Sequence, residues 1–424
     1  METMEITTAA AAAGKPGHKM TKLGWLPEEW DITTLADIVD PERNITYGIV
    51  QAGPHVEDGV PYIKTGDLSA EINPEKLSRT SHEIAQQYSR SEVYPGDIVF
   101  SLRGDVGASR IVPINLPVAN LTQGTARIAV LDESDRDFVF QQITSPDVAK
   151  RLLDQAKGST FQEITLKALR LFSVVWPPER ERAAIAELLT SFDKGTRNLS
   201  DLLIAKRMYK RGLMQQLLAG QRRFPEFQEQ PWQEVKLGEV FRKKSMKNVG
   251  NRISLVITVG KYAIRPQLSH FNRSVASSDL SAYNVIEPGD FVYDPMSAYY
   301  GAIGRYDLTE EGVVSPVYRV LTIQSSFDSD FVKQLLKSPY ILGRLDNAST
   351  QGNKEGKRRG LQDGAFNTIS FQCPPLPEQQ RIAAVLTACD QEIELLQAQL
   401  RQWQQQKKGL MQQLLTGQLR VPNA

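Results

Sequence analysis

A long internal repeat constrains the fold of this chain more than any other feature of its sequence. Residues 210–218 read KRGLMQQLL and residues 407–415 read KKGLMQQLL, so Gly212 and Gly409 are 197 positions apart. The same offset pairs further residues, which include Pro177 with Pro374, Ile185 with Ile382, Asp193 with Asp390, and Pro225 with Pro422. The repeat predicts two structural units of about 200 residues, each of which ends in the same element.

The upstream part of each unit repeats more loosely. YPGDIVFS at residues 94–101 matches EPGDFVYD at residues 287–294, and Gly107-Ala108 matches Gly301-Ala302. The ends of the units are therefore closely kept while their bodies diverge. We interpret the chain as one shared structural frame that carries two bodies with two-fold pseudo-symmetry. Because the bodies diverge, we expect them to differ in what they recognise.

The closely repeated end of each unit has the pattern of a long helix. Steps of four and three alternate along both copies, which is the a/d pattern of heptads. The ten positions of the second copy are Ile382, Leu386, Cys389, Ile393, Leu396, Leu400, Trp403, Lys407, Leu410 and Leu414, of which all but Lys407 are apolar. The ten of the first copy are Ile185, Leu189, Phe192, Thr196, Leu199, Leu203, Lys206, Lys210, Leu213 and Leu217, of which seven are apolar. Gly220 and Gly417 supply helix stops.

A seam this narrow suits one partner helix, and the simplest partner is the other copy. We therefore predict an intramolecular coiled coil, antiparallel because each helix leaves one body and the bodies must lie at opposite ends. From Glu181 to Ala219 the helix would be about 58 Å long at 1.5 Å per residue. That length corresponds to about 17 base-pair steps of DNA at most. A dimerisation coiled coil between separate chains is the alternative, but it does not explain two unlike bodies in one chain.

The two bodies mix short strands with helices and are predicted to be α+β. Strands are expected in YPGDIVFSL, RIAVL, LFSVVW, EPGDFVY and VYRVLTI, and helices at residues 147–156 and 331–338. The predicted divisions are a disordered tail at 1–20, a first body at 21–176, a first long helix at 177–222, a second body at 223–373, and a second long helix with the C-terminal end at 374–424.

Composition describes an ordinary globular chain of 424 residues with a net charge of +1. No apolar run approaches the roughly 20 residues of a membrane span, and the polyalanine tail lacks the pattern of a secretory signal. Cys373, Cys389 and only four histidines argue against a disulfide framework and a zinc site. We therefore expect a cytoplasmic protein without a metal site of its own.

Motifs of catalysis are missing from the sequence. Neither a G-x-x-x-x-G-K-[ST] phosphate loop nor a G-x-G-x-x-G fingerprint occurs. The run Asp294-Pro295-Met296-Ser297 only partly matches the Asp-Pro-Pro-Tyr of amino-methyltransferases. A nuclease-like Glu234-Val235-Lys236 has no second carboxylate nearby.

Polar, glycine-flanked loops occupy matching places in the two bodies and carry side chains of the kinds that read base edges. The candidates in the first body are Lys64, Thr65, Arg103, Asp105 and Gln123. Those in the second are Lys261, Tyr299, Tyr300, Lys357, Arg358 and Arg359. Basic runs at residues 242–247 and 206–211 are further candidates for phosphate contact. Each such loop or run can also be an ordinary turn or a solvated face.

Taken in order and in duplicate, these segments resemble a known family over residues 20–424. The resemblance lies in GWLPEEWDITTL at 24–35, PGDIVFSLRGDVG at 95–107, LPEQQRIAAVL at 376–386 and the two GLMQQLL segments, each followed by Gly-Gln. The chain resembles the DNA-specificity subunit of type I restriction-modification enzymes. The alternative from another class is a coiled-coil adaptor between proteins, without a DNA role, and filter binding with duplex DNA separates the two.

The resemblance implies a non-catalytic subunit whose bodies are target recognition domains for the two halves of a split DNA sequence, with the helices as a ruler. Two methyltransferase subunits would carry S-adenosylmethionine. Motor-nuclease subunits would join for cleavage, so ATP and Mg are likewise expected on partners. Since the repeated KxGLMQQLL segments are more alike than a heptad seam requires, we predict that Met214, Gln215, Gln216, Met411, Gln412 and Gln413 bind the two methyltransferase subunits.

Overall fold

The computed structural model describes residues 16–156, 162–261, 263–268, 277–349 and 360–421. The chain divides into two compact units: unit 1 is Met1–Ser200 with Gln399–Ala424, and unit 2 is Asp201–Ala398. The division crosses both long helices, so each unit contains the beginning of one helix and the end of the other. Each unit mixes helices and sheets and is α+β, as predicted.

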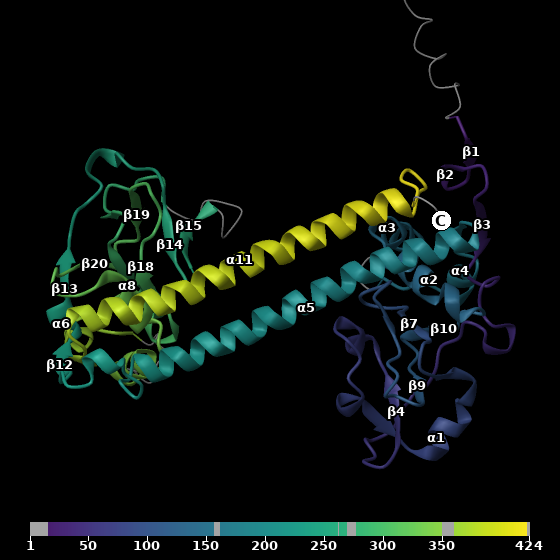
Figure 1. The fold of residues 1–424 in the computed structure, drawn as a ribbon, viewed down its shortest axis with the longest axis horizontal. Coiled ribbons are helices and arrows are strands. Elements are labelled where there is room, and N and C mark those ends of the chain that lie inside the picture. Colours follow the sequence, from purple (N-terminus) through teal and green to yellow (C-terminus); the bar gives the residue numbers. More distant parts are fainter. Residues whose placement is uncertain (1–15, 157–161, 262, 269–276, 350–359, 422–424) are drawn as a thin grey trace, which may run out of the picture. The chain divides into compact units, whose positions relative to one another are not determined.

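The two long helices are α5 (Glu179–Leu217) and α11 (Leu376–Leu414), drawn in teal and yellow in Figure 1. Each has 39 residues, and both ends obey the offset of 197 seen in the sequence. Each begins directly after a proline pair, because a proline lacks the N–H that a first helical turn does not need. Gly220 and Gly417, both at φ 68°, end the helices in the left-handed conformation that glycine adopts without strain.

The body of unit 1 is built from short strands and short helices. Its larger sheets have the strand orders β5-β4-β9-β6 and β10-β7-β8, and the pairs β1-β2 and β3-β11 complete it. The strands are β1 (His18–Thr21), β2 (Gly24–Pro27), β3 (Asp31–Thr34), β4 (Val60–Ile63), β5 (Ser78–Thr80), β6 (Glu92–Val93), β7 (Ile98–Ser101), β8 (Ser109–Ile111), β9 (Ala119–Leu121), β10 (Thr125–Ile128) and β11 (Ser173–Trp176). The helices before α5 are α1 (His82–Gln87), α2 (Arg136–Ile143), α3 (Pro146–Gln155) and α4 (Leu166–Arg170).

The body of unit 2 has a four-stranded sheet of order β13-β20-β17-β18 and the pairs β12-β21, β14-β15 and β16-β19. The strands are β12 (Gln233–Lys236), β13 (Phe241–Lys244), β14 (Ile257–Val259), β15 (Ile264–Pro266), β16 (Asn284–Ile286), β17 (Phe291–Tyr293), β18 (Ile303–Arg305), β19 (Gly312–Val314), β20 (Arg319–Ile323) and β21 (Ser370–Cys373). The helices are α6 (Leu237–Val240), α8 (Ser329–Leu336), α9 (Pro339–Ala348) and α10 (Asp363–Thr368). The strands and helices expected from the sequence are thereby confirmed.

The loosely repeated PGD segments fold into the same turn in both units. Asp97 and Asp290 are buried, and their carboxylates accept the backbone N–H of Tyr94 at 2.7 Å and of Glu287 at 2.8 Å. The glycine before each aspartate has a φ near +90°, at 93° and 91°. A buried carboxylate needs such hydrogen bonds, which is why the Asp and the Gly recur while the flanking residues vary.

Within each unit, the beginning of one long helix packs against the end of the other. In unit 1, Ile185 and Leu189 of α5 share a buried cluster with Met411 and Leu414 of α11. In unit 2, Leu213 and Leu217 share a cluster with Ile382 and Leu386. Burying one such leucine side chain contributes about 1.5–3 kcal/mol, so these contacts attach both helices to both bodies.

The lysines at heptad positions are ion-paired inside each unit. Lys407 Nζ lies 2.6 Å from Asp193 Oδ1 in unit 1, and Lys210 Nζ lies 2.6 Å from Asp390 Oδ1 in unit 2. The two pairs are related by the repeat. A polar pair within an apolar seam fixes the register of two helices.

Candidate nucleic-acid interface

The three candidate loops of unit 1 lie together. Strands β4 and β9 are parallel, with Ile63 opposite Leu121, so the loops that leave their carboxyl ends are neighbours. Strand β10 is antiparallel to β7, with Thr125 opposite Ser101, which brings the Arg103 loop to the same place. Leu102 N–H donates to Gly124 O at 2.8 Å, and Thr125 Oγ1 donates to Ile63 O at 3.0 Å.

Side chains at this meeting point are held by neighbours while remaining accessible. Lys64 is exposed and its Nζ donates to Ser78 Oγ at 2.9 Å. Arg103 Nε lies 3.0 Å from Glu163 Oε1, and the arginine side chain is 41% exposed. Thr65 and Gln123 are half-buried, and Asp105 is exposed. An exposed ion pair such as that of Arg103 is worth little, so a nucleic acid could displace its carboxylate.

Two candidate loops of unit 2 also lie together. One is the turn between β14 and β15, which holds Lys261; the other is the turn Ala298–Tyr300 between β17 and β18. A Cβ placed on Gly301 would lie 3.4 Å from Lys261 Cγ and 3.5 Å from Lys261 O, so the two backbones are in close contact. Tyr299 and Tyr300 pack edge to face, with ring centroids 5.2 Å apart. Lys357, Arg358 and Arg359 lie outside the described residues.

Four lysines of the other basic runs are already ion-paired. Lys243 pairs with Asp363 at 3.1 Å, and Lys244 lies 2.6 Å from both Glu287 and Asp290. On α5, Lys206 Nζ lies 2.6 Å from Glu392, and Lys210 is paired with Asp390. Neighbouring carboxylates already neutralise the charges of these four lysines. The lysines therefore fit the alternative interpretation, in which the basic runs have a structural role and do not contact phosphates.

The two segments that partly match catalytic motifs, residues 294–297 and 234–236, also have structural roles. The Asp294 carboxylate accepts from the N–H of Met296 at 3.0 Å and from the Ser297 hydroxyl, which forms the turn before Ala298–Tyr300. Glu234 and Lys236 lie on β12, paired with β21. Among the described residues, no three His, Cys, Asp or Glu side chains gather as metal ligands. No helix in the described part of the chain is long and apolar enough to cross a membrane.

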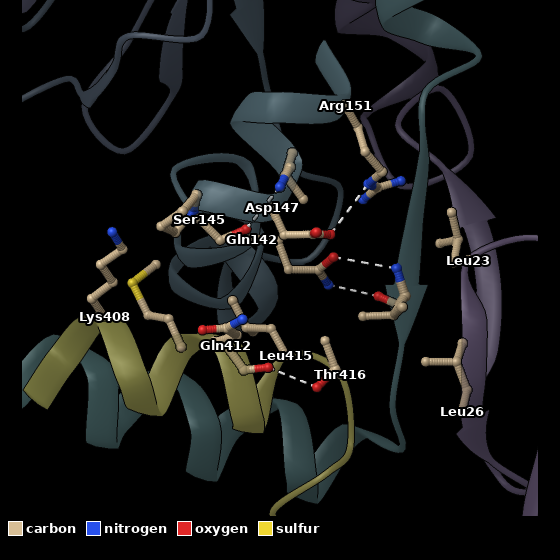
Figure 2. Close-up of a pocket in the computed structure, with 14 residues that line it drawn as sticks. Leu23, Leu26, Gln142, Ser145, Asp147, Arg151, Lys408, Gln412, Leu415 and Thr416 are labelled. Atoms are coloured by element: carbon tan, nitrogen blue, oxygen red, sulfur yellow. Dashed lines mark hydrogen bonds and ion pairs between the residues drawn. The ribbon is translucent and has the colours of Figure 1, made fainter. Parts of the chain in front are cut away.

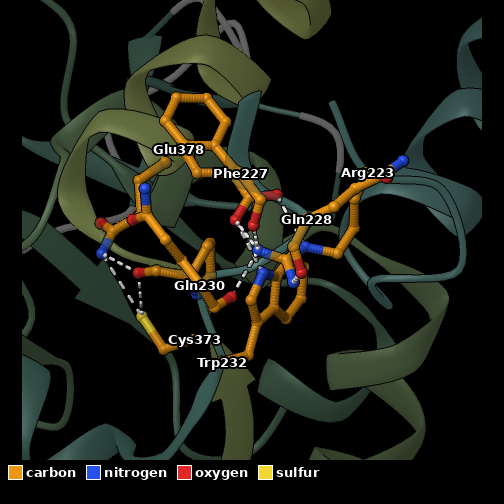
Figure 3. Close-up of polar contacts among 9 residues, drawn as sticks. Arg223, Phe227, Gln228, Gln230, Trp232, Cys373 and Glu378 are labelled. Atoms are coloured by element: carbon orange, nitrogen blue, oxygen red, sulfur yellow. Dashed lines mark hydrogen bonds and ion pairs between the residues drawn. The ribbon is translucent and has the colours of Figure 1, made fainter. Parts of the chain in front are cut away.

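A cluster of a tryptophan, a glutamate and an arginine, which we call the tryptophan clamp, recurs in both units. In unit 2, shown in Figure 3, Trp232 Nε1 donates to Glu378 Oε2 at 2.8 Å, and Arg223 Nη2 lies 2.7 Å from the same oxygen. In unit 1, Trp30 Nε1 donates to Glu181 Oε2 at 2.8 Å, and Arg420 Nη2 lies 2.9 Å from that oxygen.

The tryptophan clamp joins distant parts of the sequence at the start of each long helix: Trp30, Glu181 and Arg420 in unit 1, and the segment of Arg223 and Trp232 with Glu378 in unit 2. Hydrogen bonding to Glu181 raises the pKa of Arg420, and hydrogen bonding to Glu378 raises that of Arg223. Both carboxylates are buried, so each depends on its arginine and tryptophan for the hydrogen bonds that water would otherwise supply. The tryptophan clamp thereby attaches the start of each long helix to the residue that directly precedes β3 in unit 1 and β12 in unit 2.

The repeated GLMQQLL segments differ from our expectation in one respect. Met214 and Met411 are buried in the clusters of units 2 and 1, so the expectation that they face a partner is wrong. A methionine that follows a seam leucine still points at the body of its own unit, because the apolar stripe of a helix attached to a globular body is wider than an a/d seam. Gln215, Gln216, Gln412 and Gln413 are exposed.

In unit 1 the end of α11 borders a cavity of about 350 Å³, shown in Figure 2. One wall is the last turns of α11 and another is the start of α3, where Asp147 lies 3.5 Å from Arg151. The cavity is lined by Leu23, Leu26, Gln142, Ser145, Pro146, Asp147, Val148, Arg151, Val175, Lys408, Met411, Gln412, Leu415 and Thr416. The lining combines apolar side chains such as Leu23, Leu26 and Met411 with the charged Asp147, Arg151 and Lys408.

Comparison with known proteins shows what this chain is similar to. A sequence profile described as the type I restriction modification DNA specificity domain matches residues 27–205. The EcoBI specificity subunit of Escherichia coli is 30% identical over 162 residues, which cover 38% of this chain and 34% of that protein. The putative MjaX specificity subunit of Methanocaldococcus jannaschii is 23% identical over 437 aligned residues, covering 95% of this chain and 96% of that protein. Residues 27–205 thus match the type I restriction modification DNA specificity domain, and nearly the whole chain is similar in sequence to a specificity subunit at 23% identity.

Solved structures share the fold of this chain over nearly its whole length. The S subunit of the type I system from M. genitalium has a TM-score of 0.57 at 16% identity, covering 91% of this chain and 96% of that one. A chain from a study of complex assembly and conformational transition in the type I system has a TM-score of 0.54 at 16% identity, covering 93% and 99%.

Sequence reasoning missed several residues that organise the fold. Glu181 and Glu378 obey the offset of 197, as do Arg223 and Arg420, so the repeat contained the signal for the tryptophan clamp. No feature of the sequence singled out Lys337, whose side chain contacts both candidate loops of unit 2. It matches Thr144 in the other body, since the run Asp-Phe-Val-x-Gln, followed by Ser-Pro, aligns residues 137–146 with 330–339.

Proposed function

We propose that this specificity subunit reads a bipartite DNA sequence, with one half-site read by each unit. The observation that carries the proposal is that candidate loops far apart in the sequence meet in each unit. In unit 1 they meet at the ends of β4, β7 and β9, and in unit 2 at the turns around Lys261 and Tyr300. Two unlike loop sets on one repeated frame are suited to two different half-sites.

The long helices would act as the ruler between the half-sites, as an antiparallel coiled coil. Support comes from the contacts within each unit, where Lys407 pairs with Asp193 and Lys210 with Asp390, two ion pairs that the repeat relates to each other. Phe192 and Trp403, also at heptad positions, have ring centroids 5.2 Å apart. A helix of 39 residues is about 58 Å long, which bounds the spacing of half-sites at about 17 base-pair steps.

The chain would contribute recognition and leave the chemistry to its partners. Two methyltransferase subunits would bind S-adenosylmethionine, and motor-nuclease subunits, in a system that also cleaves, would bind ATP and Mg. The division of the chain into the predicted tail, target recognition domains and spacer helices belongs to this proposal, with the tryptophan clamps at the junctions. A cytoplasmic location follows from the same role.

A surface that occurs twice on a pseudo-dyad would bind one kind of partner twice. With Met214 and Met411 buried, the exposed candidates are Gln215 and Gln216 in unit 2 and Gln412 and Gln413 in unit 1. Replacing Gln412 and Gln413 by glutamate, without disturbing the buried methionine, should reduce the complex from two methyltransferase subunits to one in native mass spectrometry. Retention of both subunits would move the docking surface elsewhere.

Selection from random duplex DNA tests the proposed function. The chain, assembled with its methyltransferase subunits, should enrich two short defined segments separated by a constant length of undefined sequence. Because phosphate contacts alone give no such enrichment, a uniform pool after selection would contradict DNA reading and favour the adaptor alternative. Arg103→Ala should relax the sequence at one half-site only, and the repeat of the selection with that variant assigns the half-site of unit 1.

A further inference from the structure

Lys337 contacts both candidate loops of unit 2 at once. It follows α8 directly, and its Nζ donates to Lys261 O at 3.0 Å and to Gly301 O at 2.7 Å. These carbonyls belong to two different turns, the one between β14 and β15 and the one between β17 and β18. One ammonium group has three donors, so a single side chain can hold both turns.

The surroundings of Lys337 restrict where these turns can lie. Gly301 has a φ of 114°, a conformation that residues with a Cβ rarely adopt, and its backbone lies against that of Lys261. A Cβ on Gly304 would lie 3.5 Å from Lys337 Cε, so the lysine stem passes closely over β18. Burial lowers the pKa of Lys337 to about 8. The partly buried amine is satisfied by its two backbone acceptors, and burying a polar group without such partners is costly.

The matching position in unit 1 has no such bridge. Thr144 Oγ1 donates to Phe140 O at 2.7 Å, within its own helix. Unit 1 joins its loops through strand pairing instead, as in the bond from Leu102 N–H to Gly124 O at 2.8 Å. The lysine bridge is thus a property of one body, which fits two bodies that read different half-sites.

We propose that Lys337 is a positioning residue that sets the separation of the two DNA-facing turns of unit 2 and thereby the sequence preference of that half-site. This inference rests on the proposed function. Lys337 need not touch DNA, because displacement of a turn by even 1 Å removes the geometry on which base-edge hydrogen bonds depend. The residues that would carry the effect to DNA are those on the turns, Lys261, Tyr299 and Tyr300.

The test is a panel of duplexes that differ by one base pair at each position of the selected target. The complex with Lys337→Met should lose about tenfold in discrimination between base pairs at one half-site. The free energy of one or two lost hydrogen bonds to the bases corresponds to about a tenfold change in affinity. Discrimination at the other half-site, the one relaxed by Arg103→Ala, should stay within twofold. The matched control is Lys333→Met, one turn earlier on α8, which removes an ion pair with Asp307 and touches neither turn.

The outcomes separate this inference from the function on which it rests. If the wild-type complex discriminates at neither half-site, both fall. If the wild type discriminates at both and Lys337→Met does so equally, the inference alone is overturned, as it is when Lys333→Met has the same effect. Where Lys337→Met does not fold, Lys337→Arg decides, since its guanidinium keeps donors for both carbonyls on a longer stem. It should fold and alter preference at the unit 2 half-site only, and an unaltered preference overturns the inference.

Discussion

The tryptophan clamp of each unit offers a direct test of how the helices are attached to the bodies. Arg420→Met removes the cation from unit 1 and leaves the Glu181 carboxylate, 4% exposed, with only the indole N–H of Trp30. Arg223→Met does the same in unit 2, where the Glu378 carboxylate is 0% exposed and accepts from Trp232. The two substitutions are matched by the repeat, and each belongs to one unit only.

The structure predicts different magnitudes for the two substitutions. Breaking a buried ion pair from one side costs about 3–5 kcal/mol. Since Arg420 is 44% exposed, solvent screening reduces its loss to about 1–2 kcal/mol. Arg223 is 18% exposed and also donates to the carbonyls of Phe227 and Gln230, so its loss should be about 3 kcal/mol or more. At about 2–4 °C per kcal/mol for domains of this size, the shifts in Tm are about 2–8 °C and about 6–12 °C.

Hydrogen exchange resolved by peptide, together with calorimetry, measures both effects. Arg420→Met should lower protection in the peptides of unit 1, and Arg223→Met should lower it in those of unit 2. The double variant Glu181→Gln with Arg420→Met should recover part of the loss, because it removes the unpaired buried charge. Equal protection in Arg420→Met and the wild type, a larger effect for Arg420→Met than for Arg223→Met, or no recovery in the double variant would refute this reasoning.

Three further predictions concern the reading loops. Exchange of residues 21–175 for the matching body of another specificity subunit should change one half of the methylated motif and leave the other, as read by methylation-sensitive sequencing; a change in both halves would contradict independent reading. Replacement of Lys357, Arg358 and Arg359 by glutamine should weaken DNA binding for all sequences and lower the slope of log K against log salt by about 1 for each phosphate that is no longer neutralised, whereas an unaltered slope would exclude a role in binding phosphates. Because burial lowers the pKa of Lys337 to about 8 from 10.5, folded unit 2 binds fewer protons than the unfolded chain between those values. The unfolding free energy of the wild type should therefore rise with pH above 8 relative to Lys337→Met, and a constant difference from pH 7 to 10 would contradict the shift.

The long helices could be predicted closely from the sequence because two independent signals agree there. The heptad pattern gives the element, and the proline pairs and glycines Gly220 and Gly417 give its limits. The repeat then confirms each copy against the other. The observed ends, Glu179–Leu217 and Leu376–Leu414, fall where these signals place them.

The contacts of the loops could be predicted only in part. That the loops of residues 64–67, 101–105 and 122–124 meet depends on strand pairing between β4 and β9, which are far apart in the sequence, and no local pattern encodes it. The burial of Met214 and Met411 was missed because heptad reasoning assigns only two positions in seven to the interior, whereas these helices also pack against a body. Lys337 was missed because a lysine in an amphipathic helix is ordinarily exposed.

The central claim is that two long helices hold two DNA-reading units at a fixed separation, and lengthening those helices tests it most directly. One heptad inserted in both α5 and α11, at paired heights, adds about 10 Å of rise and keeps the seam in phase. The methylated motif of such a variant, read by methylation-sensitive sequencing, should keep both half-sites and gain about three base pairs of undefined sequence between them. A folded variant that methylates the original motif with its original spacing would contradict the claim.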